Sequence, residues 1–403
     1  MNAGDTVFVL MSAALVMLMT PGLALFYGGM VRNKNVLGTI MQSFILLGVI
    51  TLEWVLIGYS MSFGPDIGGI VGNLDLFALK GVGMEPAEGS TIPHLAFMIF
   101  QCMFAIITPA LITGAFAERF KFSAFLLFSL LWAILVYNPL CHWAWGGGWM
   151  GSMGALDFAG GTVVHISSGS AALIAALVIG KRKGYGSTAY IPHNLPMTIT
   201  GAALLWFGWF GFNAGSALAC NGLAANAFVV THISSAVAAL AWVFAEWLHS
   251  GKPTTLGAAS GAVAGLVAIT PACGFVSPVA SIIIGAVAGV LCFGGVMLKS
   301  KLGYDDSLDV VGIHCLGGIW GALATGLFAS TAINPDGANG LFLGNPGQLW
   351  IQFVSVVGTM VFSFIMTFII LKVVKMMVGL RVSDEDEERG LDISLHNETG
   401  YNT

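Results

Sequence analysis

The stretch Gly161-Thr-Val-Val-His165-Ile-Ser-Ser-Gly169 carries no charged residue and is largely apolar, yet it contains a histidine. The stretch Val310-Val-Gly-Ile-His314-Cys-Leu-Gly-Gly318 has the same character. An imidazole at membrane depth must find a hydrogen-bond partner or face a wet cavity, because an unsatisfied polar group in hydrocarbon costs several kcal/mol. The two histidines therefore mark a candidate pathway through an apolar protein.

The composition predicts an all-α polytopic membrane protein. Apolar residues make up 57% of the 403 positions and charged residues only 9%, and the mean hydropathy is +0.87, whereas ordinary globular chains hold roughly 25% charged residues. No interior segment is polar enough and long enough to form a soluble domain. The six cysteines lie in or beside apolar runs without paired spacing, so we expect free thiols. Nothing in the sequence predicts a cofactor or a nucleic-acid partner.

Apolar windows of about 20 residues, the length that crosses a bilayer as a helix, predict eleven membrane spans. The ends of these spans are defined only to within several residues. The predicted spans lie near residues 6–31, 36–63, 93–117, 122–141, 162–180, 196–217, 225–248, 256–272, 277–298, 309–330 and 348–375.

The positions of the basic residues predict the orientation, because Lys and Arg accumulate on the cytoplasmic side of a membrane. With eleven spans and the N-terminus outside, fourteen of the 15 basic residues fall on the cytoplasmic side, and only Lys80 lies opposite. With an even number of spans, the basic residues would no longer gather on one side of the membrane. The segment Met1-Asn-Ala-Gly-Asp5 lacks basic residues, which favours an uncleaved first span over a signal peptide. We therefore expect a multi-pass protein of the cell (plasma) membrane with its C-terminus in the cytoplasm.

The sequence predicts two parts, a transmembrane domain over residues 1–378 and an acidic cytoplasmic tail over residues 379–403. From Arg381 onward the tail carries seven acidic and two basic residues, so its net charge equals the −5 of the whole chain. The acidic run could be merely a solvated end. The alternation of Leu391, Ile393 and Leu395 suggests instead that the tail packs on the cytoplasmic face.

A weak internal recurrence in the sequence indicates an inverted repeat. Ile107-Thr-Pro-Ala110 in the third predicted span recurs as Ile269-Thr-Pro-Ala272 in the eighth, and the fifth and tenth spans each carry one histidine. Segments five spans apart cross the membrane in opposite directions, and transporters built in this way place their site near the midplane between the repeats. Small-residue patterns such as Gly257-Ala-Ala-Ser-Gly261-Ala-Val-Ala-Gly265 and Gly285-Ala-Val-Ala-Gly289 are interpreted as helix-packing surfaces.

Several roles are open for the polar residues. Each histidine could be a core residue bonded to a backbone carbonyl, or the two could line a narrow channel and handle hydrogen bonds or protons; a metal site lacks a third ligand at suitable spacing. Asp157 fits a helix N-cap, and its carboxylate would also favour a nearby cation. Glu53 lies within a span and is a functional candidate by default. We favour a helix-packing hydrogen bond for Glu53, because its surroundings offer no counter-charge.

The aromatic residues are also ambiguous one by one. Trp143, Trp145 and Trp149 fit an interfacial belt, but the glycines beside Trp145 could expose its ring to a vestibule, where an indole face attracts a cation by about 0.5–2 kcal/mol. The others fit ordinary packing when taken singly: Phe100, Phe104, Trp209, Phe212 and the small residue Ser216.

Long motifs resolve much of this ambiguity by resemblance. The chain closely resembles the ammonium transporter (Amt/Mep/Rh) family over nearly its whole length. The motifs are Phe100-Gln-Cys-Met-Phe-Ala-Ile-Ile-Thr-Pro-Ala-Leu-Ile-Thr-Gly-Ala-Phe-Ala-Glu-Arg119, Ala155-Leu-Asp-Phe-Ala-Gly-Gly-Thr-Val-Val-His165, Gly208-Trp-Phe-Gly-Phe-Asn-Ala-Gly-Ser216, Asp309-Val-Val-Gly-Ile-His314 and Val378-Gly-Leu-Arg-Val-Ser-Asp-Glu-Asp-Glu-Glu-Arg-Gly-Leu-Asp392.

The resemblance implies an inverted five-plus-five repeat plus a final helix, and a homotrimer with one pore per subunit. It implies that Trp145, Ser216 and Phe104 form an outer ammonium-recruitment site, which Asp157 shapes. Phe104 and Phe212 would stack as a gate, with His165 and His314 as twin histidines in the pore. The tail would correspond to the region that couples to a P-II-type signalling protein. No family role carries over to Glu53.

The expected function is therefore uptake of ammonium or ammonia for nitrogen supply, without enzyme activity. A full charge in a low-dielectric pore costs many kcal/mol, which favours loss of the proton near the phenylalanine gate and passage of neutral ammonia past the histidines. The alternative is an ammonium sensor or regulator that signals through its C-terminal tail with little flux. The sequence does not choose between electrogenic transport and net ammonia conduction.

Overall fold

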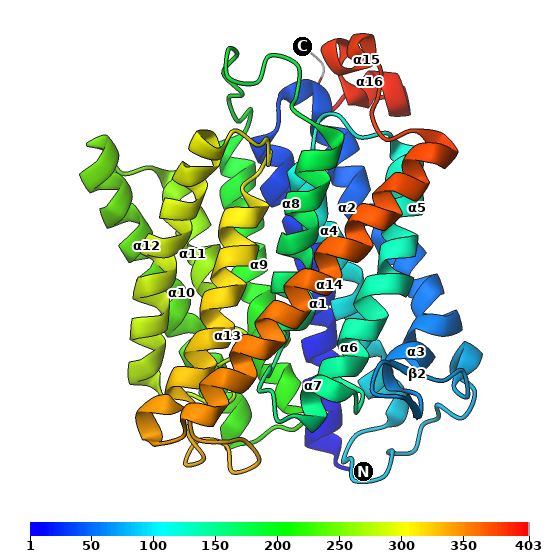
Figure 1. Cartoon of the computed structure of the whole chain (residues 1–403), viewed down its shortest axis with the longest axis vertical. Helices are drawn as coiled ribbons and strands as arrows, with labels where there is room; N and C mark the ends of the chain where they lie inside the picture. The colour runs from blue at the N-terminus through cyan, green and yellow to red at the C-terminus, as the bar shows by residue number, and fades with distance from the viewer. Residues whose placement is uncertain (402–403) are drawn as a thin grey trace.

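The computed structural model describes residues 1–401 and is a bundle of long helices (Figure 1). A two-stranded hairpin, β1 (Asp66–Ile67) with β2 (Val71–Gly72), lies at the end that carries the N-terminus. The helices are α1 (Ala3–Met30), α2 (Val36–Glu53), α3 (Tyr59–Phe63), α4 (His94–Phe116), α5 (Phe122–Trp132), α6 (Asn138–Trp145), α7 (Trp149–Ser152), α8 (Ser167–Ile179), α9 (Leu195–Ala214), α10 (Gly222–Ser250), α11 (Thr255–Ile269), α12 (Pro278–Leu302), α13 (Leu316–Phe328), α14 (Pro346–Val378), α15 (Asp384–Arg389) and α16 (Leu391–His396).

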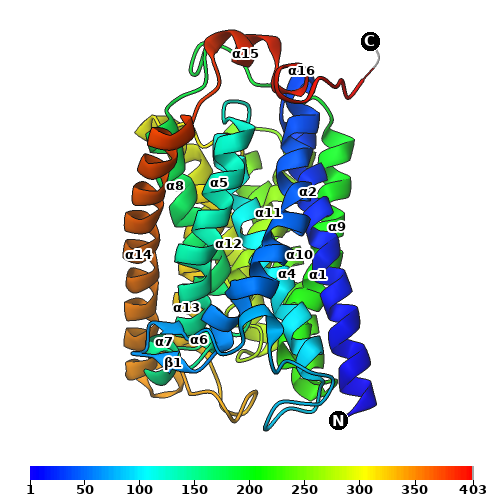
Figure 2. The same cartoon turned by 90° about the vertical axis from the view of Figure 1, so that its right-hand side faces the viewer.

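The predicted all-α polytopic fold is confirmed. Within residues 1–401, ten helical segments are long and apolar enough to cross a membrane. The remaining predicted span, 256–272, corresponds to α11, whose 15 residues reach only about 22 Å and fall short of a bilayer core of about 30 Å. It is nevertheless buried in the bundle, so protein rather than lipid surrounds it. The two termini lie at opposite ends of the bundle (Figures 1 and 2), as an odd number of crossings requires.

Local sequence explains where many of the helices begin and end. Asn221, Thr254 and Ser277 each precede a helix, and each side chain accepts a hydrogen bond from the amide three residues further on. Such caps satisfy amides that have no partner inside the helix. Gly251 and Gly303 end α10 and α12 in the left-handed conformation, which glycine adopts without strain.

The glycine patterns hold the helices of the second half together, as the packing interpretation predicted. A β-carbon at Gly265 of α11 would lie 2.5 Å from the carbonyl oxygen of Ser234 on α10, and one at Gly285 of α12 would lie 2.4 Å from the same oxygen. One turn along, Gly289 would meet the carbonyl of Ala238 at 2.4 Å. Helix α10 therefore lies against α11 and α12 at a distance that only glycine permits.

The tail packs on the molecule rather than extending into solvent. Helices α15 and α16 lie across the C-terminal end of the bundle (Figure 2). Leu391 is buried, and its amide donates to the Asn35 side chain at 2.8 Å. The Asp392 carboxylate accepts from the amides of Leu37 and Gly38 at the start of α2, at 3.0 and 2.8 Å. The tail is therefore docked on the bundle around Leu391 and Asp392, whereas in the acidic run Glu387 is buried and Asp384, Glu385 and Glu388 are exposed.

The cysteines are free thiols, as the spacing predicted. Five of the six are buried, and Cys220 is exposed.

Gly289→Ala should lower the stability of the bundle, because its β-carbon would collide with the Ala238 carbonyl. Overpacking of this kind costs about 1–3 kcal/mol. The matched control is Gly294→Ala on the same helix, where a β-carbon meets nothing within 4 Å. Thermal unfolding of the purified protein in detergent should show a lower midpoint for Gly289→Ala and a wild-type or slightly higher midpoint for Gly294→Ala. Equal midpoints for the two variants would contradict the close packing.

Candidate substrate pathway

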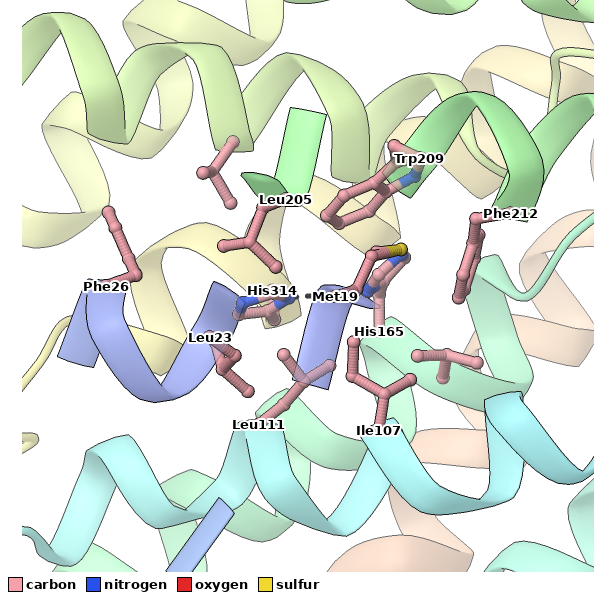
Figure 3. A pocket seen from close by; sticks show the side chains of 12 residues that line it. Met19, Leu23, Phe26, Ile107, Leu111, His165, Leu205, Trp209, Phe212 and His314 are labelled. Carbon is pink, nitrogen blue, oxygen red and sulfur yellow. Dashed lines mark hydrogen bonds between the residues drawn. The ribbon is translucent and has the colours of Figure 1, made fainter. Parts of the chain in front are cut away.

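The two histidines meet at the centre of the bundle. His165 lies in a π-helical turn, η5 (Gly161–Ile166), at the start of α8, and His314 lies in a second one, η7 (Val311–Cys315), at the start of α13. Their Nδ1 atoms are 3.3 Å apart (Figure 3), and the two side chains are almost fully buried. π-Helical turns are frequent at functional sites. The extra residue in such a turn changes the direction in which a side chain points.

The Nδ1 to Nδ1 contact determines what the pair offers to a ligand. One Nδ1 must donate and the other accept, and a neutral imidazole carries a single proton. The donating ring therefore presents an acceptor Nε2, and the accepting ring presents a protonated Nε2. The pair offers one donor and one acceptor, which suits a small solute that can use both.

The cavity beside the histidines is narrow and apolar. Its volume is about 10 Å³, close to the minimum that holds one water-sized molecule. Nε2 of His165 is buried without a hydrogen-bond partner, and a buried polar atom of this kind calls for a small ligand or water. The lining is Met19, Leu23, Phe26, Ile107, Leu111, Val164, His165, Leu205, Trp209, Phe212, Val263 and His314 (Figure 3).

Aromatic rings hold His165 in place. Its ring stacks on Trp209 with centroids 5.4 Å apart and an interplanar angle of 21°. The Trp209 indole is in turn fixed by a hydrogen bond from Nε1 to Thr270 Oγ1 at 2.8 Å. The histidine is therefore oriented by neighbours on α9 and at the end of α11.

A stacked phenylalanine pair separates this cavity from a second one. The rings of Phe104 and Phe212 lie 4.2 Å apart at 29°, and both are buried. Phe212 lines the histidine cavity and Phe104 lines the second cavity. The two stacked rings therefore lie between the two cavities.

The second cavity lies on the N-terminal side of the stack and brings together three of the predicted residues, Phe104, Trp145 and Ser216. It holds about 180 Å³. The Trp145 ring meets Phe104 edge-on at 6.0 Å, and Ser216 Oγ donates to the Phe212 carbonyl at 2.9 Å. An indole face, a hydroxyl and a phenylalanine ring therefore share one small chamber.

Asp157 caps the turn that carries His165. Its Oδ1 accepts from the amides of Gly160 and Gly161 at 2.8 and 2.6 Å, and its Oδ2 accepts from the amide and hydroxyl of Thr162 at 2.7 and 2.5 Å. Its backbone carbonyl accepts from Trp145 Nε1 at 2.8 Å. Asp157 lines neither the 180 Å³ cavity nor the histidine cavity, so its geometry is that of a residue that positions both His165 and Trp145.

The second half contains a counterpart of Asp157 that the motifs did not single out. Asp306 is buried, and its Oδ2 accepts from the amide of Val311 at 2.8 Å, the first residue of the turn that carries His314. Burial raises the pKa of Asp306 to about 6. The spacing in the sequence could have identified Asp306, because each aspartate stands eight residues before its histidine. This shared spacing supports the inverted repeat more strongly than the recurring Ile-Thr-Pro-Ala.

Glu53 lies outside both cavities, at the end of α2. Its Oε1 accepts a hydrogen bond from Nδ2 of Asn138 on α6 at 2.7 Å, and both residues are buried. The contact joins two helices, as the packing interpretation expected.

A buried ion cluster at the C-terminal end was also missed. Arg182 contacts Asp305 at 2.9 Å and Glu118 at 3.2 Å, and Glu118 also contacts Arg32 at 3.1 Å. Burial by itself would raise the pKa of Glu118, but Arg32 and Arg182 bring it below its usual value. The cluster ties four loops together, and only the fold brings these distant residues into contact. Within residues 1–401, no group of three or more metal-ligating side chains is present.

A family model described as Ammonium Transporter Family matches residues 7–401. The chain belongs to the ammonium transporter family. It is 57% identical to an ammonium transporter of Bacillus subtilis (strain 168), over all of this chain and 99% of that relative. Its fold matches the crystal structure of Candida albicans Mep2 with a TM-score of 0.91 at 36% identity, over 96% of this chain and 88% of that one.

A structure described as a sensor Amt protein matches with a TM-score of 0.89 at 29% identity, over 98% of each chain. The family membership makes this chain a multi-pass membrane transporter of ammonium or ammonia rather than an enzyme.

Asp157→Asn should disturb the first half of the pathway, because an amide has one acceptor oxygen where the carboxylate uses two. The amide's NH₂ group would face protein donors, and each unsatisfied buried group costs about 1–3 kcal/mol. We expect a lower unfolding midpoint and a several-fold lower uptake of ammonium into proteoliposomes. The control is Asp336→Asn, at an exposed carboxylate, which should behave like wild type. A wild-type midpoint for Asp157→Asn would show that the four hydrogen bonds do not depend on the carboxylate.

Proposed function

We propose that the chain takes up ammonium through this pathway, releases the proton near the phenylalanine stack and conducts ammonia past the twin histidines. The observation that carries the proposal is the order of the parts. A chamber with an indole face and a hydroxyl, a stacked aromatic pair and a narrow cavity with two imidazoles follow one another through the centre of the bundle.

Recruitment relies on Trp145, Ser216 and Phe104. Indole and phenyl faces attract a cation, and the Ser216 oxygen can accept a hydrogen bond from an ammonium N–H while its own proton points to Phe212. Asp157 is proposed to shape this chamber through its carbonyl contact with Trp145 rather than by touching the cation.

Deprotonation follows from the change in surroundings. Beyond Phe212 the walls are aliphatic and aromatic, and an unpaired charge there would cost many kcal/mol. Ammonium, unlike potassium, can lose its charge by giving up a proton. The closed stack of Phe104 and Phe212 would therefore favour a solute that enters neutral, which is the proposed basis of selectivity.

The twin histidines would then hold ammonia in transit. Ammonia carries both N–H donors and a lone pair, so it can use the donor and the acceptor nitrogen that the pair presents. The released proton either returns outside or travels along the imidazoles, whose ordinary pKa lies near neutrality.

The orientation and assembly are part of the proposal. Loops rich in basic residues gather at the C-terminal end, where Arg32, Arg119 and Arg182 meet, so this end is proposed to face the cytoplasm of a cell whose plasma membrane holds the protein. The pathway lies within one chain, which fits the homotrimer with one pore per subunit that is proposed from the family.

The docked tail supports a regulatory role at the same face. Buried Glu387 pairs with Arg381 at 2.6 Å and accepts from the Lys183 amide at 2.7 Å. We propose this surface as the one that couples to a P-II-type signalling protein. The second candidate function, a sensor with little flux, is favoured by the likeness to the sensor Amt protein, and measurable ammonium flux would rule it out.

The double variant His165→Ala, His314→Ala should lose selectivity for ammonium, because nothing else polar lines the narrow cavity. We expect solid-supported-membrane currents from proteoliposomes that no longer discriminate ammonium from potassium, or a loss of at least about tenfold, the equivalent of 1.4 kcal/mol. His249→Ala, at an exposed histidine outside the pathway, is the control. Wild-type currents that still exclude potassium in the double variant would refute the role of the pair, and the absence of any ammonium current in wild type would favour the sensor.

Glu387→Gln should loosen the tail, since the amide cannot pair with Arg381 as a carboxylate does. Limited proteolysis of the full-length protein in liposomes should cut the tail several-fold faster than in wild type. Glu385→Gln, on the same helix but exposed, should keep the wild-type rate. Equal rates for the two variants would show that the tail is held by other contacts.

A further inference from the structure

His142 is a buried histidine outside the pathway, three residues before Trp145 on α6. Both of its ring nitrogens are bonded. Nδ1 lies 3.0 Å from the carbonyl oxygen of Ser62 on α3, and Nε2 lies 2.8 Å from Oδ1 of Asp66 on β1. The ring itself is buried, whereas the Asp66 side chain is 41% exposed.

These two partners determine the protonation of the ring. A carbonyl oxygen only accepts, so Nδ1 must donate. The hydrogen bond from His142 lowers the pKa of Asp66, so the exposed carboxyl is ionised at neutral pH and also only accepts. Both ring nitrogens therefore face acceptors, and each contact is a hydrogen bond only when the nitrogen concerned carries a proton.

The ring supports the turn that follows Trp145. A β-carbon at Gly146 would lie 1.9 Å from the Ser62 carbonyl and 2.6 Å from Nδ1 of His142, so the backbone there rests directly on the bonded pair. The amides of Gly146 and Gly148 both donate to the His142 carbonyl, at 3.0 and 2.9 Å. The turn that follows Trp145 therefore packs directly against His142, so the position of Trp145 depends on His142.

The hairpin β1–β2 closes over the same turn. The amide of Trp149 donates to the Gly69 carbonyl at 3.0 Å, and Nε1 of Trp143 donates to the Ile70 carbonyl at 2.8 Å. Asp66 also accepts from the Gly69 amide at 2.9 Å. The contact between Asp66 and His142 and the two hydrogen bonds from Trp149 and Trp143 together join the hairpin to the turn that follows Trp145, and these three contacts form the clasp.

We propose that His142 is a positioning residue for ammonium recruitment, an imidazolium held between Asp66 and Ser62 that fixes the turn carrying Trp145 and makes recruitment depend on outer pH. The inference rests on the proposed recruitment role of Trp145. When the ring loses one proton, either Ser62 or Asp66 faces a nitrogen lone pair. The clasp then loosens, and Trp145 is held less firmly in the chamber.

The elements packed around the ring carry other titratable groups, among them Tyr59 on α3, whose hydroxyl is bonded to His94 at 2.6 Å. Asp66 faces it from β1, and the thiol of Cys141 is its neighbour on α6. Glu53 contacts Asn138, one turn further into the bundle on the same helix. Of these, only Asp66 bonds the ring, so replacing Asp66 isolates the charged contact.

The first measurement is the ring itself. Solid-state NMR of full-length, ¹⁵N-histidine-labelled protein in liposomes should show two protonated nitrogens for His142 at neutral pH, assigned by their loss in His142→Gln. In Asp66→Asn, which keeps an acceptor but removes the charge, the second proton should be lost at lower pH than in wild type. A neutral His142 ring at neutral pH would overturn the inference.

The second measurement is the half-saturating ammonium concentration of the current, taken over a range of outer pH. In wild type it should rise above the pH at which His142 loses a proton, and in Asp66→Asn this rise should move to lower pH. In His142→Gln it should be raised between about twofold and tenfold at all pH values, the effect of a weakened cation–π contact. Asp75→Asn, an exposed carboxylate in the same outer segment, is the matched control and should keep the wild-type profile.

A profile for Asp66→Asn that coincides with that of Asp75→Asn would refute the positioning role. Trp145→Ala separates the two proposals. An unchanged half-saturating concentration in Trp145→Ala would end the recruitment proposal, and the NMR measurement would still decide whether the charged clasp exists.

Discussion

The hydrocarbon interior of a bilayer offers no hydrogen-bond partner, and the whole molecule is arranged around this constraint. Backbone groups are satisfied within helices, and close helix contacts rely on glycine, as where Gly265 and Gly285 approach the Ser234 carbonyl. The polar atoms that remain at the centre stand out for the same reason. His165 and His314 bond each other, and the unpaired Nε2 of His165 indicates where a small solute is expected.

The two halves of the molecule use the same local arrangement at the centre. In each half an aspartate caps an irregular first turn, and that turn aims a histidine at the midline: Asp157 serves His165, and Asp306 serves His314. The aspartates differ in surroundings. Asp157 has four donors from its own turn, whereas buried Asp306 has fewer, and burial raises its pKa. The two halves therefore share geometry while differing in electrostatics.

The ends of the bundle hold the charges that the centre excludes. At one end, Arg182, Asp305 and Glu118 bind loops to one another, and the tail lies over them. At the other end, the contact between His142 and Asp66 and hydrogen bonds from Trp143 and Trp149 join the hairpin to the turn that follows Trp145.

The amino-acid sequence alone was enough to predict the membrane class and the order of the apolar segments, because composition, hydropathy and the distribution of charge follow directly from the residues and govern how each segment partitions into lipid. It also singled out the two histidines as candidates for the pathway. Motif resemblance added the family and the candidate residues of the pathway. The tertiary structure confirmed that Phe104 and Phe212 stack and that the tail packs on the bundle, and it showed that α11 is a short helix enclosed by protein. It also revealed Asp306, the ion cluster around Arg182 and the clasp at His142. These depend on contacts between residues far apart in the chain, and no periodicity or composition encodes the distance between two side chains that meet only when the helices pack.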